Sequence, residues 1–278
     1  MKLVYFGTPA AAVRSLDALV DAGHEVVLVV TQPDRRRGRG NDLVASPVRA
    51  AALAHGIPVA TPVKASEIVD DVRALDADLG VVVAFGQLLP AALLDAIPAG
   101  LVNVHFSLLP RWRGAAPVER AILAGDAETG VCIMRVELSL DTGPVYAREA
   151  VTIGDDETAG ELHARLVEIG TRLLVATLPN VPRVTPELQV GESIYAEKLS
   201  VDEFELDLTR PAAELVRVVR AGNPRPGAWL AFGDARLKVW RAHEEDGRLV
   251  PDQVQPPGKR AMPYVAWQAG HRGSDPFA

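Results

Sequence analysis

Asn103 and His105, in the middle of the chain, have the residue types and the spacing of a site for acyl transfer. They lie at the end of an apolar run, residues 100–104, that we expect to form a β-strand. Residues two apart on a strand project from the same face, so the amide and the imidazole can meet one ligand. An amide N–H can stabilise an oxyanion, and an imidazole can move a proton. The spacing alone fits equally well an asparagine in a turn and a histidine bonded to the backbone.

A carboxylate that could complete such a site is Asp141, within the segment Leu-Ser-Leu-Asp-Thr-Gly-Pro at residues 138–144. Aspartic-protease chemistry is excluded because it needs two such carboxylates, and the chain has one Asp-Thr-Gly. With Asn103 and His105, however, Asp141 suits acyl transfer to an amine. Asn103 and a protonated His105 would stabilise the oxyanion, while Asp141 would orient His105 and help to take a proton from the amine. No Ser–His or Cys–His nucleophile is evident, so no covalent intermediate is expected.

The elements that must position these residues alternate between strand and helix, which predicts an α/β fold with a doubly wound, mostly parallel sheet. The expected strands are residues 3–6, 26–30, 58–60, 79–85, 100–104, 130–136 and 144–151. The expected helices are residues 10–22, 47–55, 116–124 and 158–178, the second of them capped by Ser46-Pro47. Ligands bind at the carboxyl edge of such a sheet, where Asn103 and His105 are expected.

A polar loop at residues 31–46 carries four cations within five residues: Arg35, Arg36, Arg37 and Arg39. The rest of the first half is acidic, and the whole chain has a net charge of −7. Such a cluster repels itself unless an anion meets it, so it predicts contact with phosphates. A solvated, mobile loop is the alternative.

Residues 179–193 contain three prolines and no clear period, which predicts a linker. Beyond it, residues 212–220 are expected to be helical, and the alternating segments 229–232 and 236–240 predict a small β domain. We therefore expect a catalytic domain at residues 1–180, a linker at 181–205 and a small C-terminal β domain at 206–278.

The bulk composition excludes several classes of protein. One cysteine, Cys132, excludes an internal disulfide framework and fits a cytoplasmic protein. No apolar run approaches the roughly 18 residues of a membrane span, and none of the six histidines has the spacing of a metal site. Gly7-Thr8-Pro9 lacks the glycine pattern of a dinucleotide site, and no Walker-type loop is present.

The run from Asn103 to Pro117, Asn-Val-His-Phe-Ser-Leu-Leu-Pro-Arg-Trp-Arg-Gly-Ala-Ala-Pro, followed by Leu-Asp-Thr-Gly, resembles the folate-dependent formyltransferases. Further segments resemble the branch of that family that acts on methionyl-initiator tRNA: Thr-Gln-Pro-Asp at 31–34, Gly-Arg-Gly at 38–40, Tyr-Ala-Glu-Lys-Leu at 195–199 and Asn-Pro at 223–224. The resemblance covers nearly the whole chain. It implies transfer of a formyl group from 10-formyltetrahydrofolate to the amine of initiator Met-tRNA in translation initiation, with Asn103, His105 and Asp141 as the catalytic residues.

The resemblance also implies a folate pocket and a tRNA surface. The expected folate contacts are Phe85, Gly86, Gln87, Leu88, Pro90, Ser107, Leu108, Leu109 and Pro110. The expected tRNA contacts are Arg35, Arg36, Arg37, Arg39 and Lys198, with Arg39 foremost because its flanking glycines allow close approach of the backbone. The implied partners are folate and initiator Met-tRNA, with no membrane and no metal, and we expect a monomer.

The second domain departs from the family pattern. The resemblance implies a small, OB-like β-barrel in this domain. Residues 240–250 pass almost directly to the segment Pro-Pro-Gly-Lys-Arg at 256–260, so we expect the barrel to be shortened. Candidate basic contacts there are Arg217, Arg220, Arg225, Lys238 and Lys259. The shortening keeps open a sister enzyme that formylates a nucleotide-linked amino sugar or another small amine, and a folate hydrolase that uses water. A non-catalytic RNA-binding module is the alternative from another class.

Overall fold

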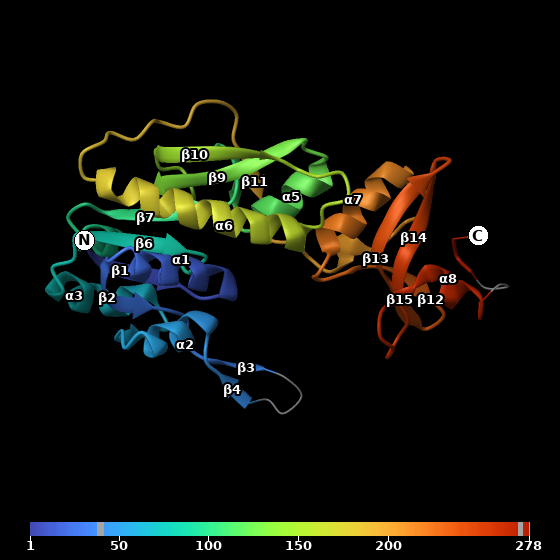
Figure 1. Cartoon of the computed structure of the whole chain (residues 1–278), viewed down its shortest axis with the longest axis horizontal. Helices are drawn as coiled ribbons and strands as arrows, with labels where there is room; N and C mark the ends of the chain where they lie inside the picture. Colours follow the sequence, from blue (N-terminus) through green and yellow to red (C-terminus); the bar gives the residue numbers. More distant parts are fainter. Residues whose placement is uncertain (38–41, 272–274, 278) are drawn as a thin grey trace. The chain divides into compact units, whose positions relative to one another are not determined.

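The computed structural model describes residues 1–37, 42–271 and 275–277 of the 278-residue chain (Figure 1). It divides into two compact units. The first comprises Met1–Arg113, Gly130–Ala150 and Ala164–Ile194, and the second comprises Gly114–Thr129, Val151–His163 and Tyr195–Ala278.

A seven-stranded sheet forms the centre of the first unit, and its order is β10-β9-β7-β6-β1-β2-β5. The five strands from β7 to β5 are parallel to their neighbours, and β9 runs antiparallel to β7. The strands are β1 (Lys2–Gly7), β2 (Glu25–Val30), β5 (Val59–Ala60), β6 (Leu79–Val83), β7 (Leu101–His105), β9 (Glu128–Arg135) and β10 (Val145–Thr152). The prediction of a doubly wound, mostly parallel α/β sheet is confirmed.

The order of the strands creates a topological switch point between β1 and β6. From β1 the chain builds outward to β2 and β5, then returns to add β6 and β7 on the other side of β1. In such folds the carboxyl edge of the sheet at the switch point is the usual place for a ligand.

Helices cover the sheet (Figure 1). They are α1 (Ala10–Asp21), α2 (Pro47–Ala54), α3 (Val69–Ala74), α4 (Ala91–Leu94) and α6 (Ala159–Thr177), with the 3-10 turns η1 (Ala65–Ile68) and η2 (Leu178–Asn180). Gly170 lets α6 lie close to the sheet, since an added Cβ there would meet the side chains of Val104 and Val131 at 2.9 and 3.1 Å. This contact supports β7 directly beside His105.

The composition of residues 31–46 predicted a loop throughout, but part of this segment forms strands. Its two flanks, β3 (Arg35–Arg37) and β4 (Asp42–Val44), pair antiparallel as a hairpin with a sheet of its own (Figure 1). A strand is recognised in a sequence by the alternation of apolar and polar residues, and a run of arginines has none. The sequence therefore gave no sign of this strand. The predicted cap at Ser46 is confirmed, because its hydroxyl accepts a hydrogen bond from Arg49 N at 3.0 Å.

The second unit contains a four-stranded antiparallel sheet in the order β12-β13-β14-β15. Its elements are α5 (Pro117–Ala124), η3 (Asp202–Phe204), α7 (Ala212–Gly222), β12 (Ala228–Phe232), β13 (Ala235–Glu245), β14 (Arg248–Gln255), β15 (Met262–Pro263) and α8 (Tyr264–Gln268). Two further short strands, β8 (Arg111–Gly114) and β11 (Ile194–Ala196), form a separate pair. The prediction of a small β domain after the α/β domain is confirmed.

Candidate active site

His105 is the last residue of β7 and is only 5% exposed. Its Nε2 atom lies 2.8 Å from the carbonyl oxygen of Trp112. A carbonyl oxygen can only accept a hydrogen bond, so Nε2 must carry the hydrogen. The contact therefore fixes the tautomer of the neutral ring, and Nδ1 is the nitrogen that can gain or lose a proton.

The carbonyl of Trp112 reaches His105 because the backbone there takes a strained conformation. Trp112 has φ 62°, in the left-handed region that a bulky side chain rarely adopts. The preceding turn is closed by the buried Ser107, whose hydroxyl donates to the carbonyl of Arg111 at 2.6 Å. Trp112 is itself buried, with the guanidinium of Arg111 4.6 Å from its ring centroid. The segment thus forms a rigid support for the imidazole.

Asp141 approaches the free side of the same imidazole. Its Oδ2 atom lies 3.7 Å from His105 Nδ1, and its side chain is 12% exposed. This separation suits an ion pair when His105 is protonated, and it exceeds the length of an ordinary hydrogen bond. The structure therefore brings together two of the three predicted catalytic residues, with Nδ1 between the ring and the carboxylate.

The loop that carries Asp141 follows a path that the sequence did not indicate. Val136, at the start of the loop, donates to the carbonyl of Leu101 at the beginning of β7. Asp141 nevertheless faces His105, at the end of β7. Residues 136–144 therefore fold back along β7, and Asp141 takes up a left-handed conformation with φ 53° on the way.

Asn103 lies two residues before His105 and projects from the same face of β7. On the neighbouring strand β9, Asn103 is opposite Met134 and His105 is opposite Cys132. Both partners are buried in a cluster with Leu109, so this edge of the sheet has a firm base. Cys132 is the core residue that its apolar surroundings indicate, and burial raises the pKa of its thiol.

The first predicted folate segment, residues 85–90, follows β6 at the switch point. Its members differ in their surroundings. Phe85 packs into the core against Phe6, with ring centroids 5.6 Å apart, and Gln87 donates to the carbonyl of Pro62 at 3.2 Å. Leu88 is 76% exposed. Gly86 has a left-handed backbone with φ 79°, and Pro90 is the N-cap residue of α4.

Two residues that were not predicted as site residues hold this segment in place. The side-chain amide of Gln32 donates to the carbonyls of Phe85 and Gly86, both at 3.0 Å. Thr8 donates to the carbonyl of Phe85 at 3.0 Å. Both follow strands at the same edge of the sheet, and a polar residue at the end of each parallel strand was the signal that could have identified them.

The second predicted folate segment is the turn that supports His105. Ser107 is fully buried, and Leu109 packs with Cys132 in the core. Leu108 lies against β9 at Gly130, where an added Cβ would collide with the leucine side chain. Pro110 lies near Gly191.

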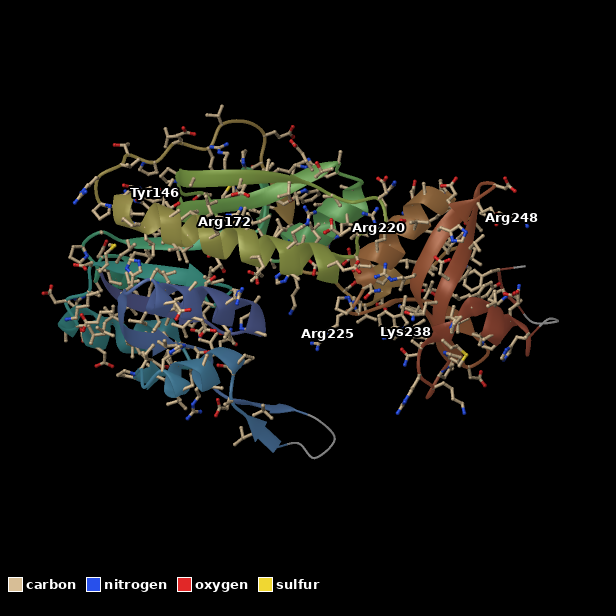
Figure 2. All side chains as sticks on the ribbon, viewed as in Figure 1. Tyr146, Arg172, Arg220, Arg225, Lys238 and Arg248 are labelled. Carbon is tan, nitrogen blue, oxygen red and sulfur yellow. The ribbon has the colours of Figure 1, made fainter. Side chains whose placement is uncertain are left out.

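The predicted tRNA contacts fall into three groups. Arg35, Arg36 and Arg37 form β3, Arg39 lies outside the described residues, and Lys198 is exposed. Arg217 donates a hydrogen bond to the carbonyl of Leu123. Arg220 donates to the carbonyls of Glu157 and Gly154. All of these residues belong to the second unit. Lys238, on β13, donates from Nζ to the carbonyl of Pro226, and the same Nζ lies 5.1 Å from the ring centroid of Trp240. Figure 2 labels Arg220, Arg225 and Lys238.

The arrangement of the fold and the site defines a class of enzyme. The "Formyl transferase" family matches residues 1–178, and the "Formyl transferase, C-terminal domain" family matches residues 198–249. The chain therefore belongs to the formyltransferase family, which uses folate.

Within that family, the chain is 50% identical over 257 residues to the methionyl-tRNA formyltransferase of Dinoroseobacter shibae. The match covers 91% of this chain and 86% of that protein, and it confirms the resemblance found in the sequence.

Solved structures share the fold. The methionyl-tRNA formyltransferase from Clostridium thermocellum matches with a TM-score of 0.63 at 14% identity, covering 95% of this chain and 99% of that one. HypX from Aquifex aeolicus, solved in complex with tetrahydrofolic acid, matches with a TM-score of 0.68 at 14% identity, covering 96% of this chain and 47% of that one.

Two features are absent from the described part of the chain. No three or more His, Cys, Asp or Glu side chains among those residues are grouped so as to hold a metal ion. No helix within the same residues is both long and apolar enough to cross a membrane.

Proposed function

We propose that this chain transfers the formyl group of 10-formyltetrahydrofolate to the amine of methionyl-initiator tRNA. The observation that carries the proposal is the orientation of His105. Its Nε2 is occupied by the carbonyl of Trp112, and its Nδ1 faces Asp141 and the space beyond the end of β7. The 50% identity to a methionyl-tRNA formyltransferase supports Met-tRNA as the acceptor.

In this mechanism the amine of the methionyl group attacks the formyl carbon of the folate. A C–N bond forms, and the carbonyl oxygen becomes an oxyanion. The amide N–H of Asn103 and the protonated Nδ1 of His105 donate to that oxyanion, as preorganised donors do in acyl transfer. Asp141 holds the imidazolium in place and accepts the proton that the attacking amine loses.

The intermediate then collapses to products. The bond between the formyl carbon and N10 of the folate breaks, and the electron pair returns to N10. A proton from Nδ1 of His105 reaches N10, so tetrahydrofolate leaves as the neutral amine. Proton transfer from Asp141 back to His105 restores the starting state, and no covalent enzyme intermediate is needed.

We place the folate at the carboxyl edge of the sheet, beside residues 85–90 and 107–110. The carbonyl of Gly86 accepts from Gln32 and keeps a second lone pair, so it is a fixed hydrogen-bond acceptor for a pterin ring. The exposed Leu88 supplies an apolar surface for the same ring.

We place the tRNA against the basic segment at 35–39 and the exposed Lys198. Four arginines in one short segment suit the phosphates near an RNA end. We further assign residues 1–180 as the catalytic domain and 206–278 as a tRNA-contacting domain joined by 181–205, with the enzyme acting as a monomer.

A transfer assay with 10-formyltetrahydrofolate tests the proposal. Initiator Met-tRNA, uncharged tRNA and nucleotide-linked amino sugars are offered separately, and product is measured as formyl-methionine or formylated sugar. Formylation of Met-tRNA alone is expected. Formylation of an amino sugar alone, or release of formate with no acceptor, would overturn the acceptor proposed here.

A further inference from the structure

Gln189 lies in the segment between η2 and β11, whose composition predicted only a linker. It is half-buried, although its neighbours Leu188 and Val190 are 77% and 85% exposed. A polar side chain that turns inward between two apolar ones that turn outward reverses the usual pattern. Such a reversal indicates that the amide serves a specific contact.

The side-chain amide of Gln189 bonds in two directions. Its Nε2 atom donates to the carbonyl of Asp141 at 2.9 Å and to the carbonyl of Gly143 at 2.7 Å. Its Oε1 atom accepts from Nε and Nη2 of Arg113 at 3.0 and 2.7 Å. The orientation of the amide follows from chemistry, because a guanidinium can only donate and a backbone carbonyl can only accept.

These contacts join the two halves of the catalytic pair. Arg113 directly follows Trp112, whose carbonyl fixes His105. Gln189 links that strand to the loop that carries Asp141, which must fold back along β7 to face the imidazole. The hydroxyl of Thr142 bonds within the loop, to the carbonyl of Ser139 and the carboxylate of Glu137, whereas Gln189 reaches the loop from another segment.

The segment that carries Gln189 is itself anchored. Glu187 exchanges two backbone hydrogen bonds with Val145, at 2.7 and 2.9 Å, and its carboxylate pairs with Arg148 at 3.2 Å. These bonds reach β10 but not the Asp141 loop. Gln189 therefore has a fixed base from which to hold the loop.

We propose that Gln189 is a positioning residue for the formyl transfer, holding Asp141 at its working distance from His105 through Arg113. The proposal rests on the function proposed above. It assigns a role in catalysis to residues 181–205 beyond connecting two domains.

The test compares Gln189→Ala with Leu188→Ala, a matched change of an exposed neighbour that leaves the amide bridge and the anchor at Glu187 in place. Hydrogen exchange of residues 137–144 in the resting enzyme, kcat, and KM for both substrates are measured. For Gln189→Ala we expect faster exchange in the loop and a fall in kcat on the order of 10- to 100-fold, as for a displaced catalytic group, with KM unchanged. For Leu188→Ala we expect no change in kcat or in the exchange of the loop.

Gln189→Glu separates the two sides of the bridge. A carboxylate still accepts from Arg113 but cannot donate to the carbonyls of Asp141 and Gly143. We expect it to lose at least as much activity as Gln189→Ala, although its pairing with Arg113 is stronger. Activity of Gln189→Glu near that of the wild type would overturn the proposal.

The remaining outcomes are equally decisive. Unchanged exchange in the Gln189→Ala loop would show that the amide does not hold it. Faster exchange with an unchanged kcat would show a structural role only, and either result overturns the positioning role. If the wild-type enzyme fails to formylate Met-tRNA, the proposed function falls, while the exchange experiment still decides whether Gln189 holds the Asp141 loop.

Discussion

The Nε2 atom of His105 lies 2.8 Å from the carbonyl oxygen of Trp112, and this contact determines which nitrogen of the ring can take part in chemistry. Only Nδ1 remains, and it faces Asp141 at 3.7 Å. In the proposed mechanism, the proton taken from the amine and the proton given to the leaving nitrogen therefore pass on the Asp141 side of the ring. The strained backbone at Trp112 and the folded-back loop at Asp141 serve one purpose, which is to place the two groups on opposite sides of a single buried imidazole.

Asp141→Asn removes the carboxylate and leaves the loop intact, because Gln189 bonds to the backbone carbonyl of Asp141 and not to its side chain. We expect kcat to fall by a factor on the order of 10² or more, as for a lost acid–base group. The melting temperature should stay that of the wild type. Steady-state formylation of Met-tRNA and thermal unfolding measure the two quantities, and near-normal turnover would contradict the mechanism.

Ser107→Ala tests the support beneath His105. The buried hydroxyl donates to the carbonyl of Arg111, and its loss leaves that acceptor without this bond in a closed turn. We expect the free energy of unfolding to fall by about 1–3 kcal/mol, measured by urea unfolding. Activity should fall as well, since the same turn presents the carbonyl of Trp112. Ser193→Ala, an exposed serine, is the control and should change neither quantity.

The sequence predicted part of this site and missed the rest, for a physical reason. The strand that ends at His105 was readable because Leu101, Val102 and Val104 make a short, mostly apolar segment. The path of the Asp141 loop was not readable, since it depends on Gln189, 48 residues further along the chain. Gln189 in turn lies in a stretch with three prolines and no period. Local patterns report the burial of regular elements, and they carry no information on a hydrogen bond between two irregular segments.

The hairpin of β3 and β4 shows the same limit in another form. The three residue pairs that join it are made by backbone groups, which any residue possesses. The sequence showed that its arginines form a charged cluster, and this charge was the basis for expecting contact with phosphates. The sequence did not show that the arginines form a strand. The charge of the segment was readable because charge is a property of the residue, whereas strand pairing is a property of the folded chain.

Arg39→Gln tests the basic segment against tRNA. We expect KM for Met-tRNA to rise more than KM for 10-formyltetrahydrofolate, because only the tRNA carries a phosphate chain. Each lost phosphate contact should reduce the slope of log(kcat/KM) against log salt concentration by about 0.7–0.9. Arg73→Gln, an exposed arginine paired with Asp70, is the control for the change in charge. Equal losses for both substrates, or an unchanged salt slope, would count against the role of the segment.

Glu161→Gln tests the start of α6 through its dependence on pH. Hydrogen bonds from the Thr158 hydroxyl and backbone N–H, with a further one from Arg241, lower the pKa of Glu161 from 4.5 to about 2. Because this pKa is lower in the folded state than in the unfolded state, the stabilisation is fully present above pH 4.5. It is lost as pH falls toward 2 and the carboxylate becomes protonated.

The side chain of Glu161 is half-exposed, so solvent screens these contacts. We expect the variant to lose about 1 kcal/mol at neutral pH, in the range of a helix cap with a surface ion pair. Urea unfolding of the wild type and the variant from pH 7 down to pH 3 measures the difference. The difference should stay constant down to about pH 5 and then shrink, whereas Glu192→Gln, an exposed carboxylate, should show little difference throughout. A difference that does not change across this range would mean that the ionised form of Glu161 is not what stabilises the start of α6.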